Sequence, residues 1–257
     1  NRTYRKIVRN RKNRITRRLA PKNWEAQSEP MLKATNIHYE MAERVQGINC
    51  GGIGAMHLLV QRVGLMKDID RSLELLKVHL PYHESDHVLN IAYNILAGGV
   101  RLEDIELRRQ DENFLNGLGA QRIPDPTTAG DFTRRFDEAD ILSLQECFNR
   151  ARVAIWKTQP KGFLKEAFID VDGTIAGTYG ECKQGMGLSY KGIWGYAPLI
   201  VSLANTKEVL YLVNRPGQAS SQEGSVEWID RAVDLVTQVS GTVTIRGDTD
   251  FSHTEQL

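Results

Sequence analysis

The chain has 257 residues, of which 41% are hydrophobic, and a formal net charge of +1, so it is long enough for one large or two ordinary globular domains. It contains no apolar run of about eighteen residues that would span a bilayer, and its beginning is too basic for a secretory signal. Three cysteines without a Cys-x-x-Cys pair indicate neither a disulfide framework nor a zinc ribbon, and we expect a cytoplasmic protein with no membrane partner.

The first 22 residues hold ten Lys or Arg and no acid, so the other residues, with 23 basic and 32 acidic side chains, carry a net charge of −9. A basic arm before an acidic body is typical of a segment that binds nucleic-acid phosphates, although a solvated basic terminus has the same composition. We expect residues 1–29 to form a flexible arm. Its candidate DNA-binding residues are Arg5, Lys6, Arg9, Arg11, Lys12, Arg14, Arg17 and Arg18.

Residues 30–160 show apolar side chains at three- and four-residue spacing, which predicts an all-α domain that binds DNA. The expected helices cover residues 84–97, residues 102–109, a segment capped by Thr127 or Thr128 that runs through Phe136, and residues 141–156. Arg134 and Arg135 are candidate phosphate contacts, although a solvated helix face is the simpler explanation of that segment. The stretch 157–162 contains Pro160 and Gly162 and is the expected domain boundary.

After residue 162 the pattern changes to the two-residue alternation of strands. Strands are predicted at residues 167–174, 196–204, 208–213 and 242–246, and the second and third form a hairpin over the turn 205–207. A helix with a capping box at residues 220–223 precedes the last strand, and its apolar stripe is Val226, Ile229, Val233, Val236 and Val239. The order is therefore strand, strand, strand, helix, strand.

Two acidic clusters end predicted strands: residues 170–174 contain Asp170 and Asp172, and residues 247–251 contain Asp248 and Asp250. If the first and fourth strands are parallel neighbours, Asp172 and Asp248 meet, and two such carboxylates repel unless a cation lies between them. Carboxylate oxygens suit Mg²⁺, and two such ions support an in-line displacement at phosphorus. An Asp at a strand end can also simply cap a turn.

Residues 170–251 resemble the core of bacterial insertion-sequence transposases of the DDE superfamily, in the branch with Asp-x-Asp-Gly-Thr and Arg-Gly-Asp-x-x-Phe motifs. The matching motifs are residues 170–174 (DVDGT), 195–199 (GYAPL), 215–217 (RPG) and 246–251 (RGDTDF). Residues 80–87, 125–130, 181–186 and 189–192 are similar to the same subgroup. The likeness covers residues 30–257, and its motifs are specific jointly rather than singly.

The resemblance implies an α/β RNase H-like catalytic core with a mixed sheet at residues 161–257, preceded by the all-α domain. It implies that Asp172 and Asp248 are the catalytic ligands of two Mg²⁺ or Mn²⁺ ions, with Asp170 as the reserve for the first position and Asp250 as a turn-stabilising residue. The third acid of the family, a Glu on a later helix, falls beyond Leu257. We therefore expect that the C-terminal part of the core is missing and that this fragment is inactive alone.

The implied activity is phosphodiester hydrolysis at the element ends, followed by transfer of the 3′-hydroxyl into target DNA. The implied partners are double-stranded DNA, both terminal inverted repeats and target, and a second copy in a homodimeric synaptic complex, with a cytoplasmic, nucleoid-associated location. Lys191, Arg215 and Arg246 lie near the acidic clusters and are candidates for holding DNA phosphates or balancing the carboxylates. Ordinary surface charge explains each of them equally well.

Residues 169–175 also resemble the first motif of haloacid dehalogenase-like phosphohydrolases, in which Asp170 would be the nucleophile and Asp172 the general acid. The predicted hairpin argues against that family, whose motif is followed by parallel βα units. A DNA-binding protein without enzymatic activity is a further alternative, but it leaves Asp172 and Asp248 unexplained.

Three histidines, His79, His83 and His87, stand at four-residue spacing. Pro81 interrupts any helix that would align all three side chains, so we do not expect a metal site there.

Overall fold

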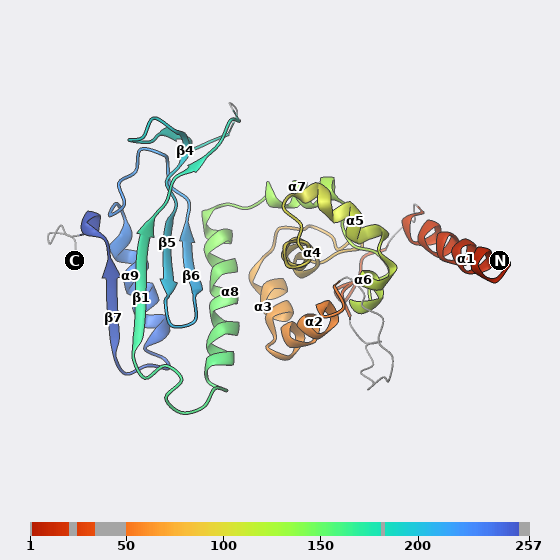
Figure 1. Cartoon of the computed structure of the whole chain (residues 1–257), viewed down its shortest axis with the longest axis horizontal. Coiled ribbons are helices and arrows are strands. Elements are labelled where there is room, and N and C mark those ends of the chain that lie inside the picture. Colours follow the sequence, from red (N-terminus) through yellow and green to blue (C-terminus); the bar gives the residue numbers. More distant parts are fainter. Residues whose placement is uncertain (1, 21–24, 34–49, 181–182, 252–257) are drawn as a thin grey trace. The chain divides into compact units, whose positions relative to one another are not determined.

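The computed structural model describes residues 2–20, 25–33, 50–180 and 183–251. The chain divides into two compact units, Asn1–Cys147 and Phe148–Leu257 (Figure 1). Lys22 of the basic segment and residues 181–182 of one motif lie outside the described residues. No helix in the described ranges is both long enough and apolar enough to cross a lipid bilayer.

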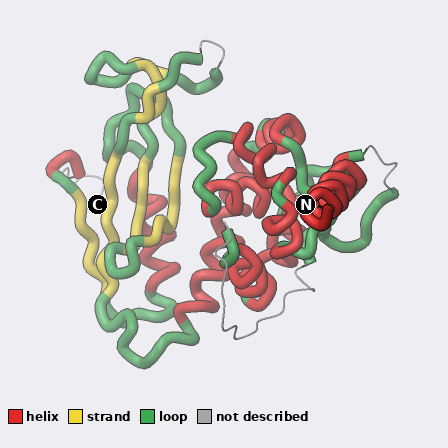
Figure 2. The backbone as a smooth tube through the Cα atoms, turned by 45° about the vertical axis from the view of Figure 1, so that its right-hand side comes forward, coloured by secondary structure: helices red, strands yellow, loops and turns green. Residues whose placement is uncertain are grey.

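The first unit is helical in its described residues (Figure 2). Its helices are α1 (Arg2–Leu19), α2 (Ile53–Arg62), α3 (Leu65–Ser72), α4 (Glu84–Leu96), the 3₁₀ turn η1 (Leu102–Asp104), α5 (Ile105–Gln110), α6 (Glu112–Gly117), α7 (Pro126–Thr133) and the first half of α8 (Glu138–Trp156). The core forms around α4, whose Leu89 and Tyr93 are buried with Ile105, Phe114 and Ile123. Burial of this apolar surface holds the short helices together.

The basic arm contains the 18-residue helix α1, where the sequence suggested a flexible segment. The helix contacts α6: Arg18 donates a hydrogen bond from Nη2 to Asn116 Oδ1 at 2.8 Å, and Arg14 lies 3.6 Å from a Glu112 carboxylate oxygen. The arm has too few apolar residues to signal a helix by periodicity, and these contacts involve residues far along the chain. Local sequence reasoning therefore could not detect it.

Helix α7 begins at Pro126, and its cap is Asp125 rather than the predicted Thr127 or Thr128. The Asp125 carboxylate accepts hydrogen bonds from the backbone N and Oγ1 of Thr128, both at 2.9 Å, and proline is well suited to the first helical position. The helix ends at Thr133, before Phe136. The predicted helix was therefore correct in place but wrong in its cap and its end.

The division between the units lies inside α8, not in the predicted linker 157–162. The second half of this helix packs on a strand of the second unit, because Asn149 Nδ2 donates to Leu210 O at 3.3 Å and Trp156 Nε1 donates to Glu208 Oε2 at 3.0 Å. These bonds make residues 148–156 part of the second unit.

The second unit is built on a mixed four-stranded sheet (Figure 1). Its strands are β1 (Ala167–Gly173), β5 (Leu199–Leu203), β6 (Glu208–Val213) and β7 (Val243–Gly247), in the order β6-β5-β1-β7. Strand β1 pairs antiparallel with β5 and parallel with β7, and β5 and β6 form the predicted hairpin. Helix α9 (Ser225–Val236) contacts β1, β5 and β6. The predicted element order, strand, strand, strand, helix, strand, is confirmed for this sheet.

Alternation along β1 separates its buried and accessible faces as predicted. Ala167, Ile169 and Val171 are buried, whereas Asp170 is half-buried and Asp172 is exposed. The apolar side of α9 supplies buried Ile229, Ala232, Leu235 and Val236. The acidic residues of β1 therefore lie on the face that the core does not use.

The start of α9 differs from the prediction. Gly224, with φ of 66°, precedes the helix and no side chain caps it, so the expected capping box at residues 220–223 does not form. The carbonyls of Ser221 and Glu223 instead accept hydrogen bonds from Arg215. Val226 is more than a third exposed and Val239 lies beyond the helix, so the buried stripe is narrower than predicted.

The Gly-rich segment after β1 forms a small three-stranded sheet that the sequence did not predict. Its strands are β2 (Ala176–Gly177), β3 (Gly187–Leu188) and β4 (Trp194–Tyr196), in the order β2-β4-β3. The predicted strand 196–204 therefore belongs to two sheets. Pro198, which cannot donate a backbone hydrogen bond, separates them, and its carbonyl accepts from Thr174 N at 3.0 Å.

Candidate active site

Strands β1 and β7 bring two acidic residues to the same edge of the sheet. In their parallel register Asp170 lies opposite Arg246 and Val171 lies opposite Gly247. The next residue along each chain is Asp172 on β1 and Asp248 after β7, and both are exposed. Because neighbouring parallel strands run about 4.8 Å apart, this register brings the two residues to adjacent strand ends.

Asp170 and Asp172 have different surroundings, which bears on the choice that the sequence left open. The Arg246 guanidinium donates two hydrogen bonds to the Asp170 carboxylate, from Nε at 2.6 Å and from Nη2 at 2.9 Å. The same guanidinium lies 5.3 Å from the centre of the Phe168 ring, and its hydrogen bonds to Asp170 raise the pKa of Arg246. The Asp172 carboxylate makes no hydrogen bond or ion pair with the described residues. Asp172 is therefore the carboxylate left available for a metal ion, and Arg246 balances Asp170.

Two glycines explain the spacing of the motifs that follow each strand. A Cβ at Gly173 would lie 2.9 Å from Ser221 Oγ, so the residue after Asp172 must be small for the loop before α9 to pass. A Cβ at Gly247 would lie 3.1 Å from Phe251 Cβ. Phe251 N donates to Asp248 O at 3.1 Å, which closes a turn around Asp248. Both glycines thus permit close packing beside the acidic residues.

A cavity of about 390 Å³ adjoins Asp248. It is lined by Thr174, Tyr190, Lys191, Arg215 and Ser221, among others. Lys191 is exposed, and its ammonium lies 5.3 Å from the centre of the Tyr190 ring. A positive group beside an acidic strand end suits the binding of a phosphate next to a carboxylate-bound cation.

Arg215, a candidate DNA contact from the sequence, is occupied within the protein. Its guanidinium donates to the carbonyls of Ala197, Ser221 and Glu223, at 3.0, 3.1 and 2.6 Å. Burial lowers the pKa of Arg215. These bonds fix the loop between β6 and α9 against the strand end, so Arg215 has a structural role that its charge alone did not indicate.

The remaining predicted DNA contacts lie in the first unit. Arg134 pairs with Asp131, and Arg135 Nη1 donates to Leu75 O at 3.1 Å. Both guanidinium groups remain exposed. Of the arm residues, Arg5, Lys6, Arg9, Arg11, Lys12, Arg14 and Arg17 are exposed and Arg18 is half-buried.

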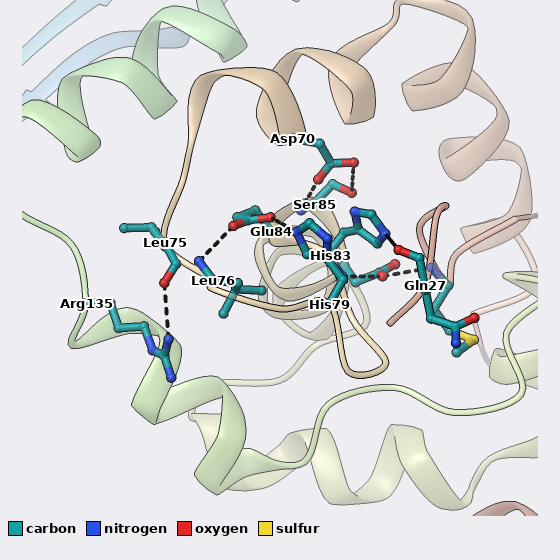
Figure 3. A network of polar contacts seen from close by, with 11 residues as sticks. Gln27, Asp70, Leu75, Leu76, His79, His83, Glu84, Ser85 and Arg135 are labelled. Carbon is teal, nitrogen blue, oxygen red and sulfur yellow. Dashed lines mark hydrogen bonds and ion pairs between the residues drawn. The ribbon is translucent and has the colours of Figure 1, made fainter. Parts of the chain in front are cut away.

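His79 and His83 lie with Glu84 in a polar network at the start of α4 (Figure 3). The rings of His79 and His83 stack with centres 3.9 Å apart and an angle of 11°, and Glu84 lies within hydrogen-bond distance of His79. His87 stacks on Phe132 instead. A metal ion lies in the plane of each imidazole that binds it, so two parallel stacked rings cannot both bind one ion without rotating.

Hydrogen bonds already occupy the polar atoms of this network. His83 Nε2 donates to Gln27 O at 2.9 Å, and Glu84 Oε1 accepts from Leu76 N at 2.9 Å. The network therefore fastens residues 25–32 to the start of α4.

The carboxylates of Asp172 and Asp248 have the chemistry that a hard divalent cation requires. Among the residues that the structure describes, neither belongs to a group of three potential metal ligands that lie within 4.8 Å of one another. Asp172 and Asp248 therefore remain candidate ligands.

The topology overturns the phosphohydrolase alternative. That alternative needs parallel βα units after β1, but the two following strands of the main sheet, β5 and β6, are antiparallel. It also needs Asp170 as a nucleophile, and this carboxylate is held by Arg246 through two hydrogen bonds.

Comparison with known proteins gives one family. The family model described as "Transposase DDE domain group 1" matches residues 48–257, which include both acidic strand ends. No curated protein and no solved structure matches the chain.

Proposed function

This chain belongs to the group 1 family of transposase DDE domains, and from that membership we propose that it cuts DNA at the ends of an insertion sequence and joins the freed 3′-hydroxyl to target DNA. The family implies an RNase H-like α/β core and DNA as the substrate. The observation that carries the proposal is the parallel register of β1 and β7, which directs Asp172 and Asp248 to one edge of the sheet.

In the proposed mechanism Asp172 and Asp248 would hold two divalent cations, Mg²⁺ or Mn²⁺. Metal bound there would supply Lewis acidity for a displacement at phosphorus. Arg246 neutralises Asp170, so a third negative charge does not add to the repulsion at the strand end. Lys191 contributes positive charge beside Asp248 for a DNA phosphate.

The resemblance also implies a third acid, but Asp172 and Asp248 belong to no group of three close potential metal ligands among the described residues. The proposal therefore rests on these two carboxylates. We also propose that the enzyme acts on terminal inverted repeats as a homodimer, in the nucleoid-associated cytoplasm, because joining two element ends requires both to be held at once.

The test compares Asp172→Asn with Asp170→Asn in this protein. Asp172→Asn and Asp248→Ala should each lower Mg²⁺-dependent strand cleavage by about a thousandfold, because a catalytic metal ion contributes several kcal/mol to such reactions. Asp170→Asn, on the same strand and face, should lower it by about tenfold or less, since it only weakens the contact with Arg246. Cleavage rates on a labelled duplex give the measurement.

Binding of Mn²⁺ to the same variants provides a readout that does not depend on turnover. Asp172→Asn should weaken Mn²⁺ binding, measured by paramagnetic resonance, and Asp170→Asn should not. Wild-type cleavage by Asp172→Asn together with loss of cleavage by Asp170→Asn would reassign the first ligand to Asp170. Wild-type cleavage by Asp248→Ala would remove that residue from the site.

A further inference from the structure

The first unit contains a cavity of about 540 Å³ that the proposed catalytic function does not use. It lies between the segment before α4 and the region around α7. Its lining includes Lys77, Tyr82, His87, Arg122, Phe132 and Arg135. All of these residues belong to the first unit.

Three residues of this lining each carry a buried polar atom that has no hydrogen-bond partner within the described part of the protein. These atoms are Tyr82 Oη, His87 Nδ1 and Arg122 Nε. Tyr82 and His87 are 7% and 4% exposed, so water around the protein reaches them little. Buried polar atoms are almost always hydrogen-bonded, and three exceptions around one cavity indicate that a ligand completes them.

The charges of the lining favour an anionic ligand. Lys77, Arg122 and Arg135 are the cationic groups, and Asp125 and Asp131 are the acidic ones. Both acids are already occupied, since Asp125 caps α7 and Asp131 pairs with Arg134. The positive groups are therefore in excess over the acids that could neutralise them.

The unpartnered atoms also favour a ligand that accepts hydrogen bonds. Arg122 Nε–H can only donate, and burial raises the pKa of Tyr82, which keeps its hydroxyl protonated. Burial, and next Arg135, lower the pKa of His87 to about 4, so its imidazole is neutral and one ring nitrogen carries a proton. A tetrahedral phosphate offers several acceptor oxygens to such a set of donors.

We propose that this cavity binds a phosphate group of the DNA backbone. The proposal rests on the proposed function, which makes DNA the substrate, and extends it to a named contact in the helical unit. A nucleobase fits less well, because the aromatic rings are already packed on one another: His87 stacks on Phe132 at 4.4 Å and Tyr82 meets His87 edge-on at 5.6 Å. Phosphate contacts of this kind fix the register of a protein on DNA without reading its sequence.

The first test removes one hydroxyl from each of two buried tyrosines. Tyr82→Phe should weaken binding of a short fluorescent duplex by about threefold to tenfold, the usual effect of one lost hydrogen bond, and should not lower the melting temperature, because the hydroxyl has no partner in the free protein. Tyr93→Phe is the matched control, since Tyr93 Oη is hydrogen-bonded to His57 Nδ1 at 2.9 Å. It should lower the melting temperature and keep the DNA affinity.

The second test measures the salt dependence of the same binding. Arg122→Gln should weaken binding by about tenfold and lower the slope of log affinity against log salt by about one, the change expected for one lost phosphate contact. Arg71→Gln is the control, because Arg71 is exposed on α3 and pairs with Asp68. Unchanged affinity and slope in Arg122→Gln, together with wild-type affinity in Tyr82→Phe, would overturn the proposal.

A third measurement separates DNA from a free anion. If inorganic phosphate raises the melting temperature of the wild type but not of Arg122→Gln, while both bind DNA equally, the cavity takes a free anion and DNA is the wrong source. All binding is measured in EDTA, without cleavage. A failure of the Asp172 cleavage test would therefore leave these results unchanged, and the two proposals can fail separately.

Discussion

His87 shows how a single buried side chain couples this protein to pH. Its ring stacks on Phe132, and burial is the main reason that its pKa falls to about 4; Arg135 lowers it further and Asp125 opposes the change. The unfolded chain titrates this imidazole near 6.5. Between pH 6.5 and 4 the unfolded state therefore binds a proton that the folded state does not, and the free energy of unfolding falls as the pH falls through this window.

We predict that His87→Phe flattens this part of the stability curve. Phenylalanine keeps the stack on Phe132 and does not titrate, so the loss of stability from pH 7 to pH 4 should shrink by about 3 kcal/mol. The pKa values of Asp70 and Asp86 are raised, and these carboxyl groups therefore increase the free energy of unfolding as the pH falls. Both groups are present in the wild type and in the variant, so their effect cancels in the comparison. Urea unfolding at several pH values measures the free energy of unfolding. Parallel plots of this free energy against pH for the two proteins would refute the prediction.

The acidic strand ends show what the sequence can and cannot predict for single residues. The motif spacing was sufficient to nominate Asp172 and Asp248, but it left Asp170 as an alternative. The distinction depends on Arg246, which lies 76 positions from Asp170 and reaches it only through the register of β1 with β7. A contact of that kind has no local signal in the sequence.

Among the elements, the small sheet depends on glycines that allow backbone segments to touch. A Cβ on Gly217 would lie 2.2 Å from Gly187 O and 2.8 Å from Gly195 O. Both atoms belong to the backbone and cannot rotate away. Gly217→Ala should therefore push β3 and β4 apart and lower the free energy of unfolding by about 1–3 kcal/mol.

The control for this change is Gly241→Ala, because a Cβ there meets nothing within 4 Å and Gly241 does not have a positive φ. It should be neutral or slightly stabilising, since alanine restricts the unfolded chain. Thermal unfolding compares the two variants, and hydrogen exchange of the β3 and β4 amides locates the effect. Equal melting temperatures for the two variants would show that the small sheet tolerates the added methyl group.

Element prediction succeeded where one face is apolar and failed where the chain turns. The alternation in residues 167–173 and the hairpin of β5 and β6 were predicted because burial imposes a regular pattern. The cap of α7, the start of α9 and the small sheet were not predicted correctly. The start of α9 follows a loop held by the Arg215 side chain, which also donates to the carbonyl of Ala197, and α7 is capped by Asp125 rather than by a neighbouring threonine.

For the whole molecule, the uneven distribution of charge predicts how the affinity for DNA depends on salt concentration. The chain carries +1 overall, yet ten of its 33 basic residues fall in the first 22 positions. Arg14 and Arg18 of α1 contact Glu112 and Asn116 of α6. The side-chain cations between residues 5 and 12 are exposed and form no ion pair with the described part of the chain, which suits them to phosphate binding.

We predict that the triple variant Arg9→Gln, Arg11→Gln, Lys12→Gln lowers the slope of log DNA affinity against log salt by about three, because each phosphate contact releases close to one counterion. These side chains are exposed on α1, so the melting temperature should stay within about a degree of the wild type, as for most surface changes. Fluorescence anisotropy of a labelled duplex across a salt series gives the slope.

The matched control neutralises Lys157, Lys161 and Lys165, three exposed lysines of the second unit. Both triple variants change the net charge equally, so a general effect of net charge would lower the two slopes together. If the arm itself contacts DNA, only the α1 variant should lower the slope of log affinity against log salt by about three. The number of counterions released depends on the number of phosphate contacts and not on the total charge of the protein. Equal slopes in the two variants would therefore contradict a DNA-binding role for the arm, whatever their absolute affinities.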